Sequence, residues 1–515
     1  MCVATCRPAY PVNRPGSGTW STAGLLASFL AFFGLRICLR CGLAALLPFA
    51  GLTWALAVAG TGGALFCAVM LMGATAGGKS FSYALGSWPP PWGIEFVVDP
   101  VSAFTVLVMA ALAFVATLFA RTALLAEIAE ADAGKAYSAW LLACGGLSGL
   151  VMTGDAFNLF VFLEISALSS VILIALGAGK DRRALIAGYN YLVIGAVGAT
   201  FYVIGVGFIY AVTGSLNMAD LAERIPQVPQ TTVVMVGFGF MMAGLLVKAA
   251  IFPVHVWLPA AYAFAPSAVS ALLAAIATKA SLYVIARVMF GMFAGVPDLA
   301  GFAAEFILVP LALAGIFLGT ILAIYENDIK KLLAFSSVAQ IGYIALGFGL
   351  ASTAGLAAGF IHIGNHALIK GGLFLAVGCY AVALGSRVNL GGMAGLGRRM
   401  PITTTAFLFC GLSLIGLPLT AGFISKLYLV RALLEADMIA VLLLVMASSA
   451  LSVVYLWKIV EVLWQKAEGE AAVTEQPALY MPLWIVAIAN IWFGIAPAPL
   501  VDGAQRAAMY LAGGL

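Results

Sequence analysis

Ionisable side chains occur in the middle of several long apolar segments of this sequence. The stretch FNLFVFLEISALSS, residues 157–170, contains a single acid, Glu164, and the apolar run around it extends from Asp155 to Lys180. A charge near the centre of a bilayer costs about 3 kcal/mol even on the lenient insertion scales. Glu164 is therefore a candidate functional residue. The alternative is a neutral Glu that makes a hydrogen bond between packed helices.

The other candidates are lysines and histidines in apolar segments, and all three histidines of the chain are among them. Histidine has the ordinary pKa nearest neutrality. A lysine removed from water holds its proton less tightly, and a nearby carboxylate opposes that change. A glutamate and several lysines coupled in this way are suited to passing protons. The predicted proton pathway consists of Glu164, Lys248, His255, Lys279, His362, His366, Lys370 and Lys426.

Three of these residues repeat at a helical spacing. His362, His366 and Lys370 are four residues apart in succession, so they share one face of a helix. A metal site on the two histidines is the alternative, but no carboxylate or thiolate nearby would complete the coordination sphere. His255 lies beside Trp257, so an anchor at the membrane interface remains open for it. The same alternative remains open for Lys279 and Lys426, whose long side chains could extend to the interface.

Two prolines interrupt apolar spans that contain a lysine. Pro253 follows Lys248 and Pro418 precedes Lys426, and each proline removes a backbone hydrogen bond. A broken helix is tolerated at membrane depth only where it is buried in protein or lines a water-filled cavity. Two such spans in different halves of the chain also suggest two related repeats.

The elements that must position these residues are predicted to be transmembrane helices. Of 515 residues, 63% are hydrophobic and 9% charged, with a mean hydropathy of +1.10, whereas soluble domains carry about 25% charged residues. The composition predicts an all-α polytopic membrane protein with little outside the bilayer. Fourteen spans are predicted near 21–35, 42–75, 101–120, 136–153, 156–177, 185–212, 231–258, 264–291, 300–325, 332–352, 354–385, 402–424, 436–459 and 478–500. The second and eleventh are long enough to be broken or tilted.

The net charge of +4 is distributed unevenly over the loops. Alternate connections are basic, and the opposite ones, such as 213–230, are nearly neutral. The positive-inside rule then places the basic loops in the cytoplasm and both termini outside, in a multi-pass protein of the plasma membrane. The basic residues are Arg36, Arg40, Lys180, Arg182, Arg183, Lys330, Lys331, Arg387, Arg398 and Arg399.

The remaining motifs indicate no cofactor. Residues 1–20 are polar and are predicted to be a tail rather than a cleaved signal. Cys38 and Cys41 form a lone CxxC, which is weak evidence for a metal, and the eight cysteines are interpreted as inert thiols. The sequence contains no P-loop, no convincing dinucleotide fingerprint and no cysteine set for an iron–sulfur cluster. We expect no bound cofactor or metal, no redox chemistry in this chain and no nucleic-acid partner.

The segments that carry these residues resemble the proton-translocating membrane subunits shared by respiratory complex I and the Mrp-type cation/proton antiporters. The matching stretches are GDAFNLFVFLEISALSS, KAAIFPVHVWLPAAYAFAPSAVSALLAAIATK, ENDIKKLLAFSSVAQIGYIALG, HIGNHALIKGGLF and LPLTAGFISKLY. Upstream, SYALGSWPPPWGIEFVVDPVSAF looks most like the D-type subunit of the antiporters. Its prolines and Gly93 predict an external hairpin leading to Asp99, which can cap the next helix.

The resemblance implies a fourteen-helix fold with two inverted five-helix repeats, each containing one broken helix. The expected divisions are a tail (1–20), N-terminal helices and hairpin (21–135), a first repeat (136–291), a second repeat (300–459) and a C-terminal loop and helix (460–515). Within the family pattern, Glu164 matches the glutamate that modulates Lys248, and Lys279 matches the central lysine. His255 and the His362–His366–Lys370 group match polar residues that link the half-channels. Lys426 matches the last residue of the row of ionisable side chains. Many relatives carry Lys where this chain has Asn190, and some carry His where it has Gln340.

The expected function is ion translocation, chiefly of protons, by a membrane subunit of a cation/proton antiporter or an NADH-dehydrogenase-like complex. The expected partners are other membrane subunits, the lipid bilayer and protons, with Na⁺ or K⁺ passing elsewhere in the assembly. Two alternatives remain open. One is a stand-alone secondary transporter, and the other is a non-conducting membrane anchor of an electron-transfer assembly of the complex I or hydrogenase type.

Overall fold

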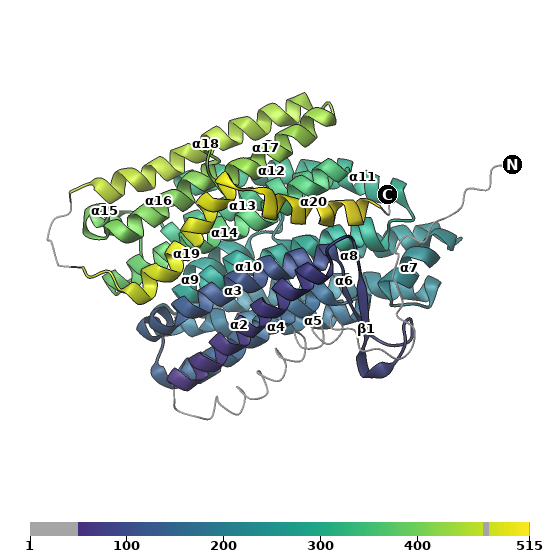
Figure 1. Cartoon of the computed structure of the whole chain (residues 1–515), viewed down its shortest axis with the longest axis horizontal. Helices are drawn as coiled ribbons and strands as arrows, with labels where there is room; N and C mark the ends of the chain where they lie inside the picture. The colour runs from purple at the N-terminus through teal and green to yellow at the C-terminus, as the bar shows by residue number, and fades with distance from the viewer. Residues whose placement is uncertain (1–49, 467–472, 514–515) are drawn as a thin grey trace.

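The computed structural model describes residues 50–466 and 473–513, and almost all of this part is helical (Figure 1). Eleven of the described helices are long and apolar enough to cross a membrane. The protein is thus a polytopic helical membrane protein, as predicted. The tail 1–20, the predicted span 21–35, the start of the span 42–75 and the Cys38–Cys41 pair lie outside the described residues.

Two helices differ from the prediction: Ala421–Glu435 lies mostly between the predicted spans 402–424 and 436–459, and Ala498–Ala512 lies mostly beyond 478–500. The long helices otherwise follow the predicted spans. They are α2 (Ala50–Ala74), α3 (Pro100–Glu127), α4 (Ala133–Met152), α5 (Ala156–Ala175), α6 (Arg183–Thr213), α8 (Thr231–Ala249), α10 (Ser267–Arg287), α12 (Val309–Tyr325), α13 (Ile329–Gly349), α14 (Thr353–Leu384), α16 (Pro401–Ile415), α17 (Ala421–Glu435), α18 (Ile439–Trp464), α19 (Pro477–Ile495) and α20 (Ala498–Ala512). The short ones are α7 (Met218–Arg224), α9 (Trp257–Phe264), α11 (Pro297–Phe302) and α15 (Leu396–Arg399). The predicted span 354–385 is the single continuous helix α14.

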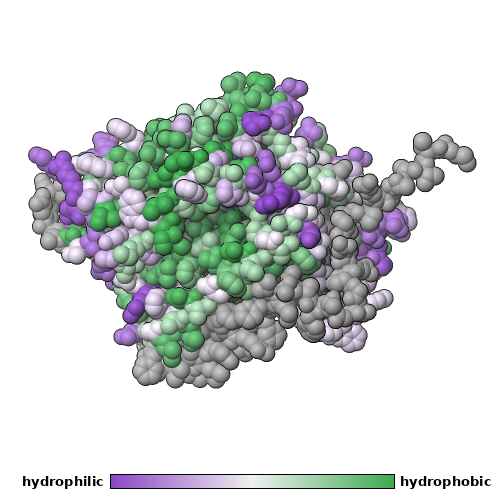
Figure 2. Space-filling view, viewed as in Figure 1, coloured by the Kyte–Doolittle hydropathy of each residue, from purple (hydrophilic) through white to green (hydrophobic). Residues whose placement is uncertain are grey.

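The centre of the molecule is formed by α10, α13 and α14, whose residues are almost all buried. They pack against one another, and α14 also contacts α3, α16, α17, α19 and α20. Outer helices such as α2, α6 and α18 expose large apolar side chains instead. Figure 2 shows these as a broad hydrophobic surface, with hydrophilic side chains at the two ends of the long axis and a further group over α20. That distribution matches a protein surrounded by lipid.

Small residues let neighbouring helices approach closely, as is common in membranes. A Cβ atom on Gly244 of α8 would lie 2.3 Å from the carbonyl oxygen of Gly198 in α6. A Cβ atom on Gly342 of α13 would lie 2.7 Å from the carbonyl oxygen of Ala312 in α12. Larger residues at these positions would push the helix pairs apart.

Two membrane helices are broken at the predicted prolines. The first break separates α8 from α9 and contains Pro253, with Ala250 in the left-handed region at φ 56°. The second separates α16 from α17 and contains Pro418, with Gly416 at φ 91°. Both breaks leave backbone carbonyl groups without a helical partner at membrane depth.

A two-stranded hairpin corrects the purely helical prediction. Strand β1 (Phe81–Ala84) pairs antiparallel with β2 (Glu95–Val98), with Phe81 opposite Val98. The predicted hairpin is therefore present, and Asp99 caps α3 as expected: its carboxylate accepts from the backbone N–H of Ser102 at 2.9 Å. The hairpin and α7 lie at one end of the molecule and α15 at the other (Figure 1). We call these the hairpin end and the basic-loop end.

The last predicted span, 478–500, is two helices. Helix α19 ends at Ile495, and α20 begins at Ala498 after Pro497. The sequence prediction missed α20 because its mixed composition lacks a long apolar run. Leu500, in the first turn of α20, packs on Gly364 of α14, where an added Cβ would lie 2.8 Å from its Cδ1.

Candidate functional site

The eight predicted pathway residues lie on helices that pack together across the molecule. Glu164 is on α5, Lys248 on α8, Lys279 on α10 and Lys426 on α17, while His255 lies in the break between α8 and α9. His362, His366 and Lys370 lie on α14. The residues near the middle of this series are buried, whereas Glu164, Lys248 and Lys426 are half-buried.

Lys248 borders a cavity next to the first broken helix. The cavity has a volume of about 20 Å³ and is also lined by Ser170, Tyr191 and Trp257. A polar space of that size holds about one water molecule. The ammonium nitrogen of Lys248 has no hydrogen-bond partner among the described residues, so such a water would give it one. Gly195 of α6 makes room for it, since a Cβ there would lie 3.4 Å from Nζ.

Glu164 and Lys248 are close enough for their charges to interact, but they form no direct ion pair among the described residues. The Oε1 atom of Glu164 is buried and has no hydrogen-bond partner among those residues. Val161 and Leu168, one turn away on either side along α5, are exposed. The carboxylate therefore lies between the interior and a surface patch of α5.

His255 occupies the backbone break itself. It is 6% exposed, its ring stacks on Phe252 with the ring centres 5.3 Å apart, and its Nδ1 atom is buried without a partner in the described part of the chain. Burial argues against a role as an interfacial anchor.

Lys279 is completely buried in α10. Its ammonium group donates to the carbonyl oxygen of Ala274 and lies 3.4 Å from the hydroxyl oxygen of Thr278. A buried ammonium without a carboxylate is stable only where backbone and hydroxyl oxygens take its hydrogen bonds. The alternative of a lysine that extends to the interface is wrong for this residue.

The three residues of α14 share one helix face, as their spacing predicted. Lys370 donates to the carbonyl oxygen of Leu333 at 3.0 Å and to the hydroxyl of Ser336, both on α13. The His366 ring is fully buried, and neither of its nitrogens has a partner among residues 50–466 and 473–513. It stacks on the His362 ring with the ring centres 6.1 Å apart.

His362 connects this face to the second broken helix. Its Nε2 atom lies 3.0 Å from Oε1 of Gln340 on α13, and its Nδ1 atom lies 2.8 Å from Oγ of Ser425 on α17. The next residue, Lys426, donates to the carbonyl oxygens of Leu414 and Ile415 at 3.2 and 2.7 Å. These carbonyls are left free because α16 ends there.

Sequence reasoning missed the residues that hold the pathway side chains in place. They are Ser336 for Lys370, Ser425 for His362, and Tyr343, whose ring centre lies 5.2 Å from Nζ of Lys426. The sequence of α13 does contain a pattern that predicts two of them. Ser336, Gln340 and Tyr343 are three to four residues apart, so they share one polar face of the helix. No group of three or more His, Cys, Asp or Glu side chains that could bind a metal occurs in the described part of the chain.

The basic-loop end is held together by ion pairs between three loops. Arg387, after α14, pairs with Asp181 at 3.1 Å and with Asp328 at 2.5 Å. A hydrogen bond from Arg183 lowers the pKa of Asp181 to about 2. The three loops that the sequence placed on one side therefore meet in the structure.

The chain is similar to membrane subunits of respiratory and antiporter complexes. The model of the NADH:quinone oxidoreductase/Mrp antiporter transmembrane family matches residues 153–452. The N subunit of the NADH-quinone oxidoreductase of Desulforudis audaxviator is 42% identical over 386 residues, 75% of each chain. The D-type Na⁺/H⁺ antiporter subunit of Alkalihalophilus pseudofirmus is 31% identical over 419 residues, 81% of this chain and 83% of that protein. A chain in the structure of the Mrp complex from Dietzia sp. superposes with a TM-score of 0.85 at 27% identity, covering 95% of this chain and 98% of that one.

The helical fold, the broken helices and the buried ionisable residues define an ion-translocating membrane subunit. The chain belongs to the NADH:quinone oxidoreductase/Mrp antiporter family of membrane subunits. The resemblance to the D-type antiporter subunit predicted from the hairpin region is real, and the similarity to the oxidoreductase N subunit is at least as great.

Proposed function

We propose that this chain carries protons across the membrane along Glu164, Lys248, His255, Lys279, Lys370, His366, His362 and Lys426. The observation that carries the proposal is the alignment of the last members of the row along one helix face and onto the second broken helix. Lys370, His366 and His362 share a face of α14, and His362 contacts Ser425, the residue before Lys426. Polar residues inside a membrane protein are expensive and mark ion pathways.

The charges of neighbouring members couple their protonation. Lys279 interacts electrostatically with both His366 and Lys370, all three completely buried. Because two buried cations repel each other, protonation of one residue favours release of the proton from the next. Glu164 provides the opposite charge at the Lys248 end. A proton arriving at one end would in this way promote departure at the other.

Protons suit this row better than sodium ions. Na⁺, like other hard cations, needs several oxygen ligands, whereas the row offers one carboxylate among lysines and histidines. A coupled Na⁺ or K⁺ would cross elsewhere in the assembly. The chain itself would perform no redox reaction.

The arrangement of helices supports two inverted repeats of five spans within a fourteen-helix fold. In each run of five, α4 to α10 and α11 to α18, the fourth span is the broken one. Five crossings are an odd number, so the second repeat would start on the opposite side from the first. The boundaries would be 136–291 and 300–459, after N-terminal helices and hairpin (21–135) and before a C-terminal segment (460–515).

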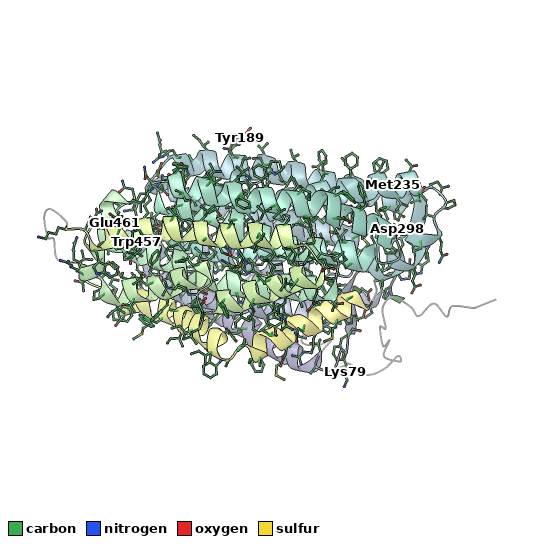
Figure 3. All side chains as sticks on the ribbon, turned by 90° about the horizontal axis from the view of Figure 1, so that it is seen from above. Lys79, Tyr189, Met235, Asp298, Trp457 and Glu461 are labelled. Atoms are coloured by element: carbon green, nitrogen blue, oxygen red, sulfur yellow. The ribbon has the colours of Figure 1, made fainter. Side chains whose placement is uncertain are left out.

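The orientation follows from the loop charges. The basic-loop end would face the cytoplasm, with the hairpin end and both termini outside, in the plasma membrane. Figure 3 views the molecule from above, with Glu461 towards the basic-loop end and Lys79 and Asp298 towards the hairpin end.

Other membrane subunits would be the partners of this chain. The half-buried Glu164 and the exposed Phe157, Val161 and Leu168 beside it form a face on which a neighbouring subunit would shield the carboxylate from lipid. The host would be an antiporter, a complex I relative or a hydrogenase relative. Which of these it is would be evident from the adjacent genes.

Proton uptake into everted membrane vesicles containing the assembled complex tests the function. Lys370→Met removes a buried titratable group at the centre of the row, and transport should fall at least about a hundredfold. Unchanged uptake in Lys370→Met, with normal assembly, would leave the anchor alternative. Proton movement by the purified chain alone would favour the stand-alone transporter.

A further inference from the structure

A second cavity opens at the basic-loop end, outside the proposed pathway. It has a volume of about 90 Å³, and its lining includes Glu127, Phe264, Ser267, Lys330 and Arg387. These residues come from α3, α9, α10, α13 and the loop after α14. The cavity is large enough for several waters, and one hydroxyl on it, that of Ser267, is buried without a partner among the described residues.

Lys330 is the buried cation of this cavity. It is 7% exposed, and its ammonium group donates to the carbonyl oxygen of Ala265 at 3.0 Å. Among the described residues it forms no ion pair. The next residue, Lys331, is half-buried and lies over the ring of Phe264, 5.7 Å from its centre.

The charged groups that face Lys330 come from three elements, and each already has another partner. Glu127 of α3 accepts from the backbone N–H of Ser267 at 2.7 Å. Asp328 and Arg387 bind each other. Two more charged residues line the cavity: Asp181, which is paired with Arg183 and Arg387, and Lys180, which is exposed. Lys330 is therefore the buried amine of this cavity, without an ion pair among the described residues, that can exchange a proton with its water.

The acceptors of Lys279 and Lys370 lie within a few helical turns of Lys330 and of its own acceptor, Ala265. The carbonyl oxygen of Ala265, directly after α9, also lies 3.3 Å from the hydroxyl of Ser270 on α10. Ala274, one turn further along α10, is the acceptor for Lys279. On α13, Leu333 lies one turn after Lys330, about 4.5 Å along the axis. Its carbonyl oxygen is the acceptor for Lys370.

We propose that Lys330 is the proton-loading residue of the pathway at the basic-loop end. It takes a proton from water in the cavity onto Nζ and gives it up towards Lys279 and Lys370, so that each cycle returns it to its starting charge. This inference rests on the proposed function. The competing role is structural, because a lysine can cap the free carbonyl at the end of a helix such as α9.

Chemical rescue separates the two roles. Lys330→Cys is made in the assembled complex, in a background without native cysteines, and assayed by proton uptake into everted vesicles. We expect uptake to fall at least about tenfold. Aminoethyl methanethiosulfonate, which rebuilds a titratable amine on the thiol, should restore it. The trimethylammonium analogue, which adds a permanent charge, should not. Lys331→Cys is the matched control and should keep its uptake.

The remaining outcomes of this experiment contradict either the loading role of Lys330 or the whole pathway. Three outcomes would overturn the loading role: rescue by both reagents, unchanged uptake in Lys330→Cys, or an introduced thiol that does not react. In each of these cases, loss of uptake in Lys370→Met would still support the proposed pathway. Unchanged uptake in both Lys330→Cys and Lys370→Met would remove the pathway as well. If Lys330→Cys does not assemble, Lys330→Arg decides. Arg retains the hydrogen bond but not the exchangeable proton, so lost uptake supports loading and retained uptake overturns it.

Discussion

Oε1 of Gln340 on α13 lies 3.0 Å from Nε2 of His362 on α14, so a hydrogen bond joins the two helices beside the second broken helix. An amide oxygen is only an acceptor, so with Oε1 towards the ring Nε2 is the donor. Proton exchange is then confined to Nδ1, which lies 2.8 Å from Oγ of Ser425. The Ser425 hydroxyl can donate to Nδ1 when the ring is neutral, or to the carbonyl oxygen of Gly422 at 3.1 Å when the ring is cationic. His362 can thus change its charge without moving.

Gln340→Leu should impair proton transport, because it leaves the Nε2 hydrogen of His362 buried and unpaired at a cost of about 1–3 kcal/mol. Ser425→Ala should impair it too, by removing the hydroxyl that serves both charge states. The measurement is proton uptake into vesicles at matched protein levels. Thr61→Ala in α2, which removes a buried hydroxyl bonded within its own helix, is the control. Equal uptake in all three variants would contradict the role of His362.

Glu164→Ala and Lys248→Ala should each reduce ion transport strongly, and the double variant should lose less than the sum of the two. The two charges interact, so removing one leaves the other uncompensated. A double-mutant cycle on transport rates measures the coupling. Strictly additive losses would mean that the two residues act independently.

Lys426→Ala should abolish most transport with the protein still assembled, and Lys426→Glu should retain part of it. A neutral Glu can donate one hydrogen bond to the carbonyl of Ile415, which now accepts from Lys426. Lys426→Arg should transport poorly, because a guanidinium does not release its proton at accessible pH. The readout is dissipation of a pH gradient. Wild-type transport by the Ala variant would mean that the pathway ends before this residue.

Arg182→Cys and Trp92→Cys should react with an impermeant thiol reagent from opposite sides of the membrane. Both residues are exposed, one in a basic loop and the other in the hairpin. The positive-inside rule places Arg182 in the cytoplasm. Right-side-out and everted vesicles, with native thiols removed, provide the comparison. Labelling of both from the same side would overturn the orientation.

Asp99→Asn should destabilise the protein by about 3–5 kcal/mol, because it leaves Arg287 as an uncompensated buried cation. Arg287 makes two hydrogen bonds to the carboxylate, at 2.6 and 2.9 Å. Asn is also a good helix cap, so the loss would report the ion pair rather than the α3 cap. Thermal unfolding in detergent is the measurement. Asp132→Asn, which removes an exposed ion pair with Lys135, should change stability little.

The sequence alone determined most of the membrane spans, because an apolar run of about 20 residues has few other stable states than a buried helix. It did not determine α17 and α20, which lie largely outside the predicted spans. It also identified the ionisable residues, since their cost in lipid makes them conspicuous, and the two breaks, because proline cannot complete a helical hydrogen-bond ladder. The motifs around Glu164, Lys248 and Lys370 indicated the family before any helix was placed.

Only the tertiary structure decided which polar groups meet. Asp99 and Arg287 are 188 positions apart and Arg387 and Asp181 are 206 apart, and no periodicity in the chain relates them. Lys330 and Lys331 are neighbours of the same type, yet one is buried in a cavity and the other lies half-exposed over Phe264. Successive residues on a helix point about 100° apart, so the packing of α13 against its neighbours, rather than residue type, separates the roles of the two lysines.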